Sequence, residues 1–134
     1  MRSAVQAGVI SAAMLLVPAC GDDADGAKTE NGYEPVRRAT FRSLAARDFL
    51  VNCPGGAARA ETGYQVRRLE ELKQLAIRKN AGRAIWLGEN DWAGVARYSD
   101  REPCEGGEEA YRQALAAFSG TLDALAERIA DYRE

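Results

Sequence analysis

The chain of 134 residues contains no histidine. Histidine is the commonest general base and metal ligand near neutral pH, so its absence excludes Ser-His-Asp triads, Cys-His pairs and the usual zinc sites. Also missing are the glycine-rich loops that bind nucleotide phosphates and the C-x-x-C pair of thiol oxidoreductases. We therefore predict no enzyme activity, no catalytic residue, no metal site and no cofactor.

An excess of positive charge is missing as well. The chain has 18 Lys and Arg residues against 20 Asp and Glu residues, which gives a formal net charge of -2. The basic residues alternate with acidic ones instead of forming a long run, as on a solvated surface. This charge pattern disfavours a nucleic acid as partner.

A long uncharged segment follows Arg2, and its apolar part runs from Ala4 to Val17. A basic residue before a short apolar segment is typical of a secretory signal peptide. The segment is shorter than the ~20 residues with which a helix crosses a bilayer, so a permanent membrane span is disfavoured. We predict a signal peptide over residues 1–19, and a buried N-terminal helix is the alternative.

The apolar segment ends in Val17-Pro18-Ala19-Cys20-Gly21. This order resembles the lipobox of bacterial lipoprotein precursors, in which aliphatic and small residues precede a Cys that becomes the lipidated N-terminus. The resemblance covers only the beginning of the chain. It implies a lipid on Cys20, a membrane as partner and, because Gly21 is not Asp, the periplasmic face of the outer membrane. The alternative is cleavage by an ordinary signal peptidase, which would give a free periplasmic protein.

The chain has three cysteines, Cys20, Cys53 and Cys104. If Cys20 carries a lipid, Cys53 and Cys104 remain as an even pair, and an oxidising compartment would join them. We therefore predict a Cys53–Cys104 disulfide in an exported protein.

Two further segments follow the predicted signal peptide. Residues 20–36 are polar and rich in glycine, which predicts a flexible tether, and residues 37–134 remain for one helical domain. The acidic residues of the tether do not form a calcium loop, because the EF-hand spacing would place Gly21 where a carboxylate is required.

Hydrophobic periodicity predicts a mainly α-helical domain. A first helix is expected over residues 40–51, with Thr40 as its N-cap. Its apolar side consists of Phe41, Leu44, Ala45 and Phe49. A second helix is expected over residues 57–80, ended by Gly82. Its apolar stripe consists of Val66, Leu69, Leu72 and Ala76.

The last helix, over residues 107–132, carries an unbroken heptad stripe. The stripe consists of Tyr111, Leu115, Phe118, Leu122, Leu125, Ile129 and Tyr132. We expect it to pack against the second helix of the same chain in a monomer, and a dimeric coiled coil is the alternative. Because Cys-x-Gly-Gly precedes both long helices, a disulfide would place their starts side by side, so the two helices would run parallel.

The segment of residues 83–103 allows two interpretations, short helices or a hairpin, and we favour short helices. It holds Trp86, Trp92 and Tyr98 within thirteen positions. These aromatic residues form either a small core or a surface that binds an envelope protein or a glycan.

Paired carboxylates that act on a sugar are the remaining enzymatic hypothesis, which we consider weaker. The candidates are Glu89, Asp91, Glu102, Glu108 and Glu109. Glu108 and Glu109 also fit the first turn of the last helix, where acidic side chains interact favourably with the helix dipole.

The sequence thus favours a non-catalytic envelope protein that binds another envelope component. A small helical domain that contains Trp92, Arg97 and Cys104 also resembles the LprI-type lysozyme-inhibitor family, which implies a secreted or periplasmic inhibitor as the alternative. The spacing of the three residues departs from that family's pattern, so no inhibitory residue is assigned.

Overall fold

The computed structural model describes residues 33–133. The elements are the helices α3 (Tyr33–Val51), α4 (Ala60–Arg78), α5 (Gly82–Tyr98) and α6 (Glu108–Asp131), and the 3-10 helix η2 (Gly56–Ala58). The described part of the chain contains no strand, and none of its helices is long and apolar enough to cross a membrane. The predicted signal peptide, Cys20 and most of the predicted tether lie outside the described residues.

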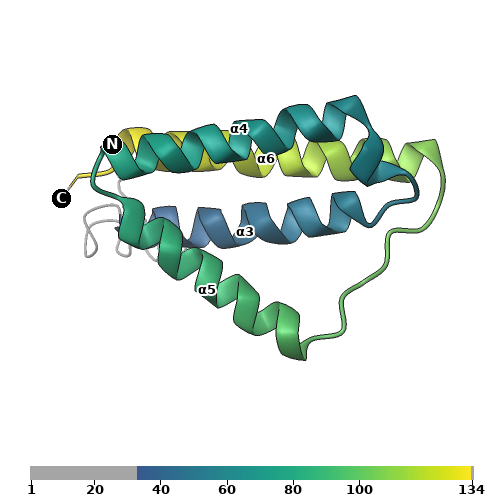
Figure 1. The fold of residues 1–134 in the computed structure, drawn as a ribbon, viewed down its shortest axis with the longest axis horizontal. Coiled ribbons are helices and arrows are strands. Elements are labelled where there is room, and N and C mark those ends of the chain that lie inside the picture. The colour runs from purple at the N-terminus through teal and green to yellow at the C-terminus, as the bar shows by residue number, and fades with distance from the viewer. Residues whose placement is uncertain (1–32, 134) are drawn as a thin grey trace, which may run out of the picture.

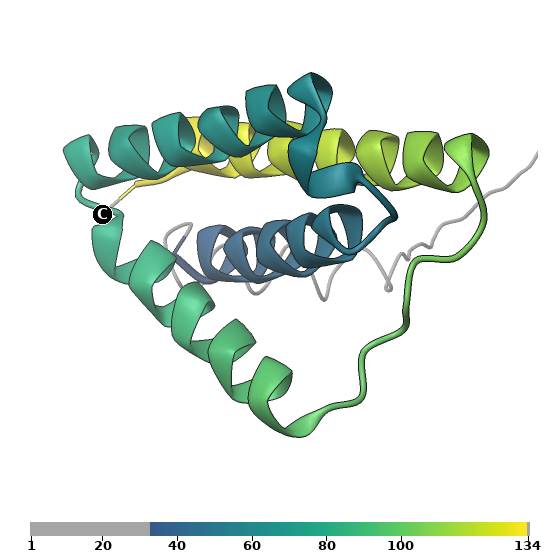
Figure 2. The same cartoon turned by 45° about the vertical axis from the view of Figure 1, so that its right-hand side comes forward.

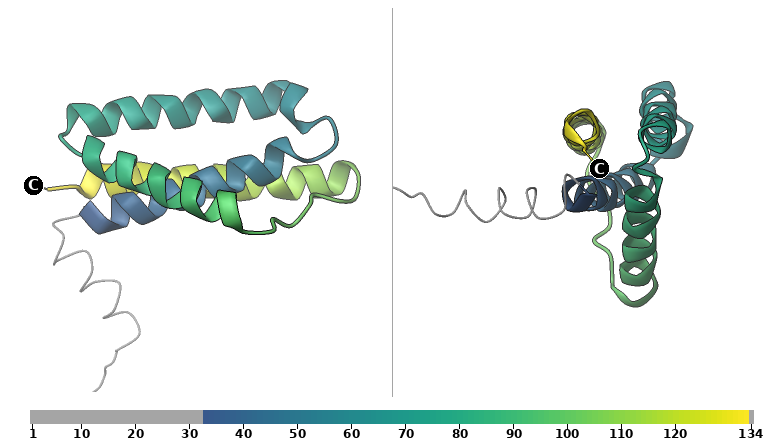
Figure 3. Two further views of the ribbon diagram at one scale, coloured as in Figure 1. Left: turned by 60° about the horizontal axis from the view of Figure 1, so that its bottom comes forward. Right: turned by 90° about the vertical axis from the view of Figure 1, so that its left-hand side faces the viewer.

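The four described helices alternate in direction along the long axis (Figure 1). α4 and α6 lie side by side and run parallel, as predicted. Their starts are joined by an ion pair between Arg59 and Glu108 at 2.9 Å, and at their ends the Lys79 ammonium donates to the Ile129 carbonyl at 2.9 Å. α3 and α5 run in the opposite direction, and α5 slants away from the other three helices (Figures 2 and 3).

The heptad stripe of α6 is the centre of the core. Phe118, Leu122, Leu125 and Ile129 are fully buried, and Leu115 is half-buried. This stripe packs against α4, as predicted, but its larger contact is with α3, which the sequence did not predict. On α4, Leu69 and Ala76 are fully buried, whereas Val66 and Leu72 only pack against the edge of the core.

The first described helix begins at Tyr33, earlier than the predicted start at Thr40. Pro35 is tolerated because the backbone N–H groups of a helix's first turn have no partner within the helix. Thr40 is therefore not an N-cap. It is fully buried, and its hydroxyl donates to the Val36 carbonyl at 2.8 Å. The predicted tether overlaps this helix at residues 33–36.

The middle segment forms one continuous helix, α5, in place of the predicted short helices or hairpin. Gly88 lies inside this helix where its backbone approaches α3 closely. A Cβ at this position would lie 2.6 Å from the Arg37 carbonyl oxygen. Gly82 does not end α4 but begins α5. The left-handed residue after α4 is Asn80, with φ 66°, a conformation that Asn tolerates.

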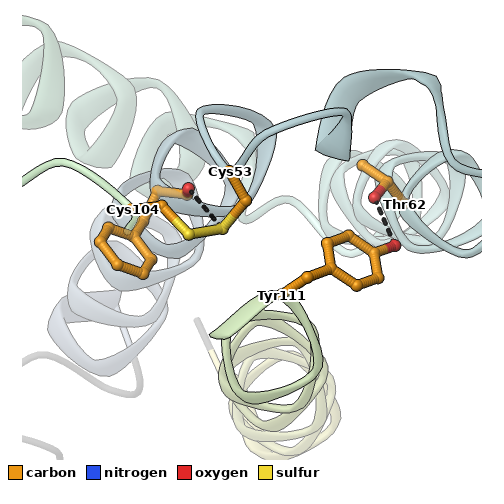
Figure 4. Close-up of a disulfide and its surroundings, with 5 residues drawn as sticks. Cys53, Thr62, Cys104 and Tyr111 are labelled. Atoms are coloured by element: carbon orange, nitrogen blue, oxygen red, sulfur yellow. Dashed lines mark hydrogen bonds between the residues drawn. A yellow bond between two sulfur atoms is a disulfide. The ribbon is translucent and has the colours of Figure 1, made fainter. Parts of the chain in front are cut away.

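The predicted disulfide is present between Cys53 and Cys104, whose Cα atoms lie 4.7 Å apart. It joins the chain just after α3 to the segment before α6 (Figure 4). In the same view the hydroxyls of Thr62 and Tyr111 share a buried hydrogen bond of 2.8 Å between α4 and α6. These two links hold the starts of α4 and α6 side by side, and the fold is mainly helical, as predicted.

Candidate functional site

Two adjoining hollows lie beside the last turns of α3, where the crossover segment (residues 99–107) leads from α5 to α6. Their volumes are about 530 Å³ and 150 Å³, and Phe49 and Glu102 line both. We call them together the Phe49 groove. The larger hollow is also lined by Pro103, Glu105, Ala110, Gln113, Ala114 and Ala117. The smaller one is also lined by Ala45, Asp48, Asn52, Trp92 and Arg101.

Phe49 lines both hollows and is 36% exposed. The sequence placed this residue on the apolar side of its helix, and that placement is wrong. α3 packs against both α6 and α5, and Leu44 and Leu50 are buried in the core. Phe49 lies on the outer side of α3, away from these buried residues. An exposed aromatic ring in a hollow is a typical anchor point for a bound partner.

The wall formed by α6 has small side chains. Ala110, Ala114 and Ala117 lie at intervals of four and three residues, so they share one face of α6 and let a ligand approach the helix closely. The opposite wall is the crossover segment, which is fixed at one point because Cys104 is bonded to Cys53. The Phe49 carbonyl oxygen lies 3.6 Å from the Cys53 sulfur, so the disulfide contacts the backbone of a residue that lines both hollows.

Asp48 organises the smaller hollow. Its carboxylate accepts hydrogen bonds from the Trp92 indole nitrogen at 2.9 Å and from the Arg101 guanidinium at 3.1 Å. The Trp92 ring also packs edge-on against Phe41, with ring centroids 5.6 Å apart. α3, α5 and the crossover segment are thereby linked, and this side of the groove has a defined shape without a ligand.

The predicted aromatic cluster is divided by the structure. Trp92 is half-buried and lines the groove, whereas Trp86 is 58% exposed and Tyr98 is 83% exposed. Neither Trp86 nor Tyr98 lines the Phe49 groove. Arg97 lies over the Tyr98 ring at 5.8 Å, and Cys104 is held in the disulfide.

The predicted carboxylates lie in separate places, and cations from other parts of the fold bind three of them. Glu89 pairs with Lys73 at 2.7 Å. Asp91 pairs with Arg37 at 2.7 Å, and this pairing lowers the pKa of Asp91. The lowered pKa favours the ionised form of Asp91, which makes it a poor general acid.

Glu108 is the most strongly perturbed of these carboxylates. Hydrogen bonds from Arg59 and then Arg112 lower its pKa to about 2. Glu109 accepts a hydrogen bond from Gln113 at 3.2 Å on the exposed side of α6. Of the five candidates, only Glu102 lines the groove. Within residues 33–133 no group of three or more His, Cys, Asp or Glu side chains is placed to hold a metal ion.

Comparison with known proteins finds no match to this chain among family models, curated proteins or solved structures.

Proposed function

We propose that this protein is a non-catalytic exported envelope protein, anchored by a lipid on Cys20 at the periplasmic face of the outer membrane, that binds another envelope component in the Phe49 groove. The observation that carries the binding proposal is an aromatic side chain, 36% exposed, in a groove where Asp48 is already bonded to Trp92 and Arg101. A preformed groove loses little conformational entropy on binding, which favours affinity.

Two features support the exported location. The leader has the charge and apolar order of a secretory signal and ends in the lipobox-like residues before Cys20. Cys53 and Cys104 lie at bonding distance in the fold, and protein disulfides persist mainly in oxidising compartments.

The chemistry of the groove indicates the kind of component that it binds. Phe49, Pro103 and the alanines of α6 offer apolar surface, and Glu102 and Glu105 add carboxylates that form no ion pair within the described residues. Glu105 and Glu102 are both exposed beside the larger hollow. A segment of another envelope protein with an apolar side chain next to a basic one fits this arrangement best.

Photo-crosslinking in intact cells tests this proposal. A photoreactive phenylalanine analogue replaces Phe49 in one variant and Tyr64 in a matched control, because Tyr64 is also an exposed aromatic but lies outside the groove. We expect one discrete crosslinked species from position 49, none from position 64, and loss of that species when Glu102→Lys reverses the charge. Repeated failure at position 49, or inhibition of lysozyme by the purified protein, would contradict the proposal, and the second result would favour the inhibitor hypothesis.

A further inference from the structure

The turn between α4 and α5 exposes two large apolar side chains, Ile77 at 51% and Trp86 at 58%. Gly82 lies between them. A Cβ on Gly82 would meet the Ile77 side chain at 3.3 Å, and Trp86 follows Gly82 by four residues on the same face of α5. These three residues lie close together at the turn, and we call them the turn patch.

Basic side chains outnumber acidic ones at this end of the bundle. The α4–α5 turn and the end of α6 contribute Arg78, Lys79, Arg83, Arg128 and Arg133. The acidic residues at the end of α6 are Glu127 and Asp131. On α4, Lys73 lies one turn before Ile77 and pairs with Glu70 and Glu89. This end of the bundle is therefore positively charged.

The opposite end has the reverse charge. The crossover segment and the start of α6 contribute Asp100, Glu102, Glu105, Glu108 and Glu109, against Arg101 and Arg112 from the same stretch and Arg59 from the start of α4. The Phe49 groove lies at this acidic end. The bundle thus carries a basic end with an apolar patch and an acidic end with a groove.

The basic end is also the end at which the described chain begins. The start of α3 lies at the same end of the bundle as the α4–α5 turn and the end of α6 (Figure 1). Cys20 precedes Tyr33 by 13 residues (33 minus 20), and these reach at most about 45 Å when fully extended. A lipid on Cys20 would keep the turn patch close to the membrane that holds the lipid.

We propose that the turn patch docks on the anionic lipid surface of that membrane, so that the Phe49 groove faces away from it. Tryptophan is enriched at membrane interfaces, and basic residues near the surface bind anionic headgroups. Because α4 rises about 1.5 Å per residue over its 19 residues, docking would hold the groove roughly 25 Å or more above the lipid. This inference rests on the proposed lipid anchor, which supplies the nearby membrane.

Quenching of tryptophan fluorescence tests the docking. The protein is produced from the full chain with its own leader, purified, and mixed with vesicles of phosphatidylglycerol and a phosphatidylcholine brominated in its acyl chains. Bromine quenches only a tryptophan that enters the lipid, and the chain has just two, Trp86 and Trp92. We expect the emission that depends on Trp86 to fall about twofold, and Trp86→Phe to abolish the quenching.

Two further variants control the measurement. Tyr98→Ser removes an aromatic side chain that is more exposed than Trp86 but lies at the other end of α5, and it should leave the quenching unchanged. Arg83→Gln should weaken the affinity for the vesicles roughly fivefold, because one basic residue near an anionic surface contributes about 1 kcal/mol.

Equal quenching in the wild type and in Trp86→Phe, or none in either, would overturn the docking. The intact mass of the same sample reports the anchor separately. An acylated protein without Trp86 quenching contradicts the docking alone. An unacylated protein whose Trp86 is still quenched contradicts the anchor and leaves the docking supported.

Discussion

The indole nitrogen of Trp92 donates a hydrogen bond of 2.9 Å to the carboxylate of Asp48, which joins α5 to α3 beside the groove. A hydrogen bond to a charged group contributes about 1.5–3 kcal/mol when it is buried, and this pair is only half-buried. We expect Trp92→Phe to lower the free energy of unfolding by about 1–2 kcal/mol in urea denaturation. Trp86→Phe at an exposed position is the control, with an expected change within about 0.5 kcal/mol. Equal effects of the two substitutions would contradict this role of Trp92.

The helix crossing at Gly88 gives a second prediction. A Cβ at this position would lie 2.6 Å from the Arg37 carbonyl oxygen and 2.8 Å from the Thr40 Cβ, so α5 must move away from α3. We expect Gly88→Ala to destabilise the fold by about 1–3 kcal/mol in thermal or chemical denaturation. Gly94 lies in the same helix, and a Cβ there would meet no atom within 4 Å, so Gly94→Ala should be neutral or stabilising by up to about 1 kcal/mol. Loss of stability in both variants would contradict the close crossing.

The Cys53–Cys104 disulfide closes a loop with a sequence separation of 51 residues. The chain-entropy relation gives about 4 kcal/mol for a loop of this length. We expect the double replacement of Cys53 and Cys104 by Ser to lower the free energy of unfolding by about that amount, measured by urea denaturation. Reductant should lower the stability of the wild type in the same direction and leave the double variant unchanged. A change below about 1 kcal/mol would show that the disulfide is dispensable for the fold.

The lowered pKa of Glu108 should make the stability of the fold depend on pH. Hydrogen bonds from Arg59 and then Arg112 lower the pKa of Glu108 from 4.5 to about 2. A group with a lowered pKa in the folded state stabilises the fold above its unfolded pKa, and this stabilisation is lost as the pH falls through the folded pKa. The difference in stability between the wild type and Glu108→Gln should therefore be full above pH 4.5 and shrink as the pH falls toward 2.

Glu61 and Asp91 also have lowered pKa values, so the wild type alone does not isolate Glu108. The difference between the two proteins removes the contributions that they share. A difference that stays constant from neutral pH down to pH 2 would show that the bond between Arg59 and Glu108 does not perturb the carboxyl group.

The last helix and the disulfide could be predicted because each depends on a pattern that is visible in the sequence. The apolar spacing from Tyr111 to Tyr132 predicted α6 because a helix buries one stripe, and Cys53 and Cys104 were the only even pair left after Cys20. The parallel direction of α4 and α6 followed from the same two cysteines.

Other features depend on packing that no local pattern contains. Residues 83–103 were expected to form short helices or a hairpin, but α5 is continuous and has Gly88, a residue without a Cβ, where it crosses α3. The first helix was expected to begin at Thr40, but it begins at Tyr33, because the first turn of a helix accepts Pro35. The exposure of Phe49 depends on which two faces of α3 are covered by α5 and α6, and the groove depends on the path of the crossover segment. Of the predicted site residues between positions 33 and 133, only Trp92 and Glu102 line that groove.

The intact mass of the protein purified from membranes, after expression of the full chain, tests the central proposal most directly. A lipid-anchored exported protein should have the mass of a chain that begins at Cys20, increased by acyl groups and reduced by the two hydrogens lost when Cys53 and Cys104 are oxidised. A protein recovered from inside the cell that still begins at Met1, with both thiols reduced, would contradict it.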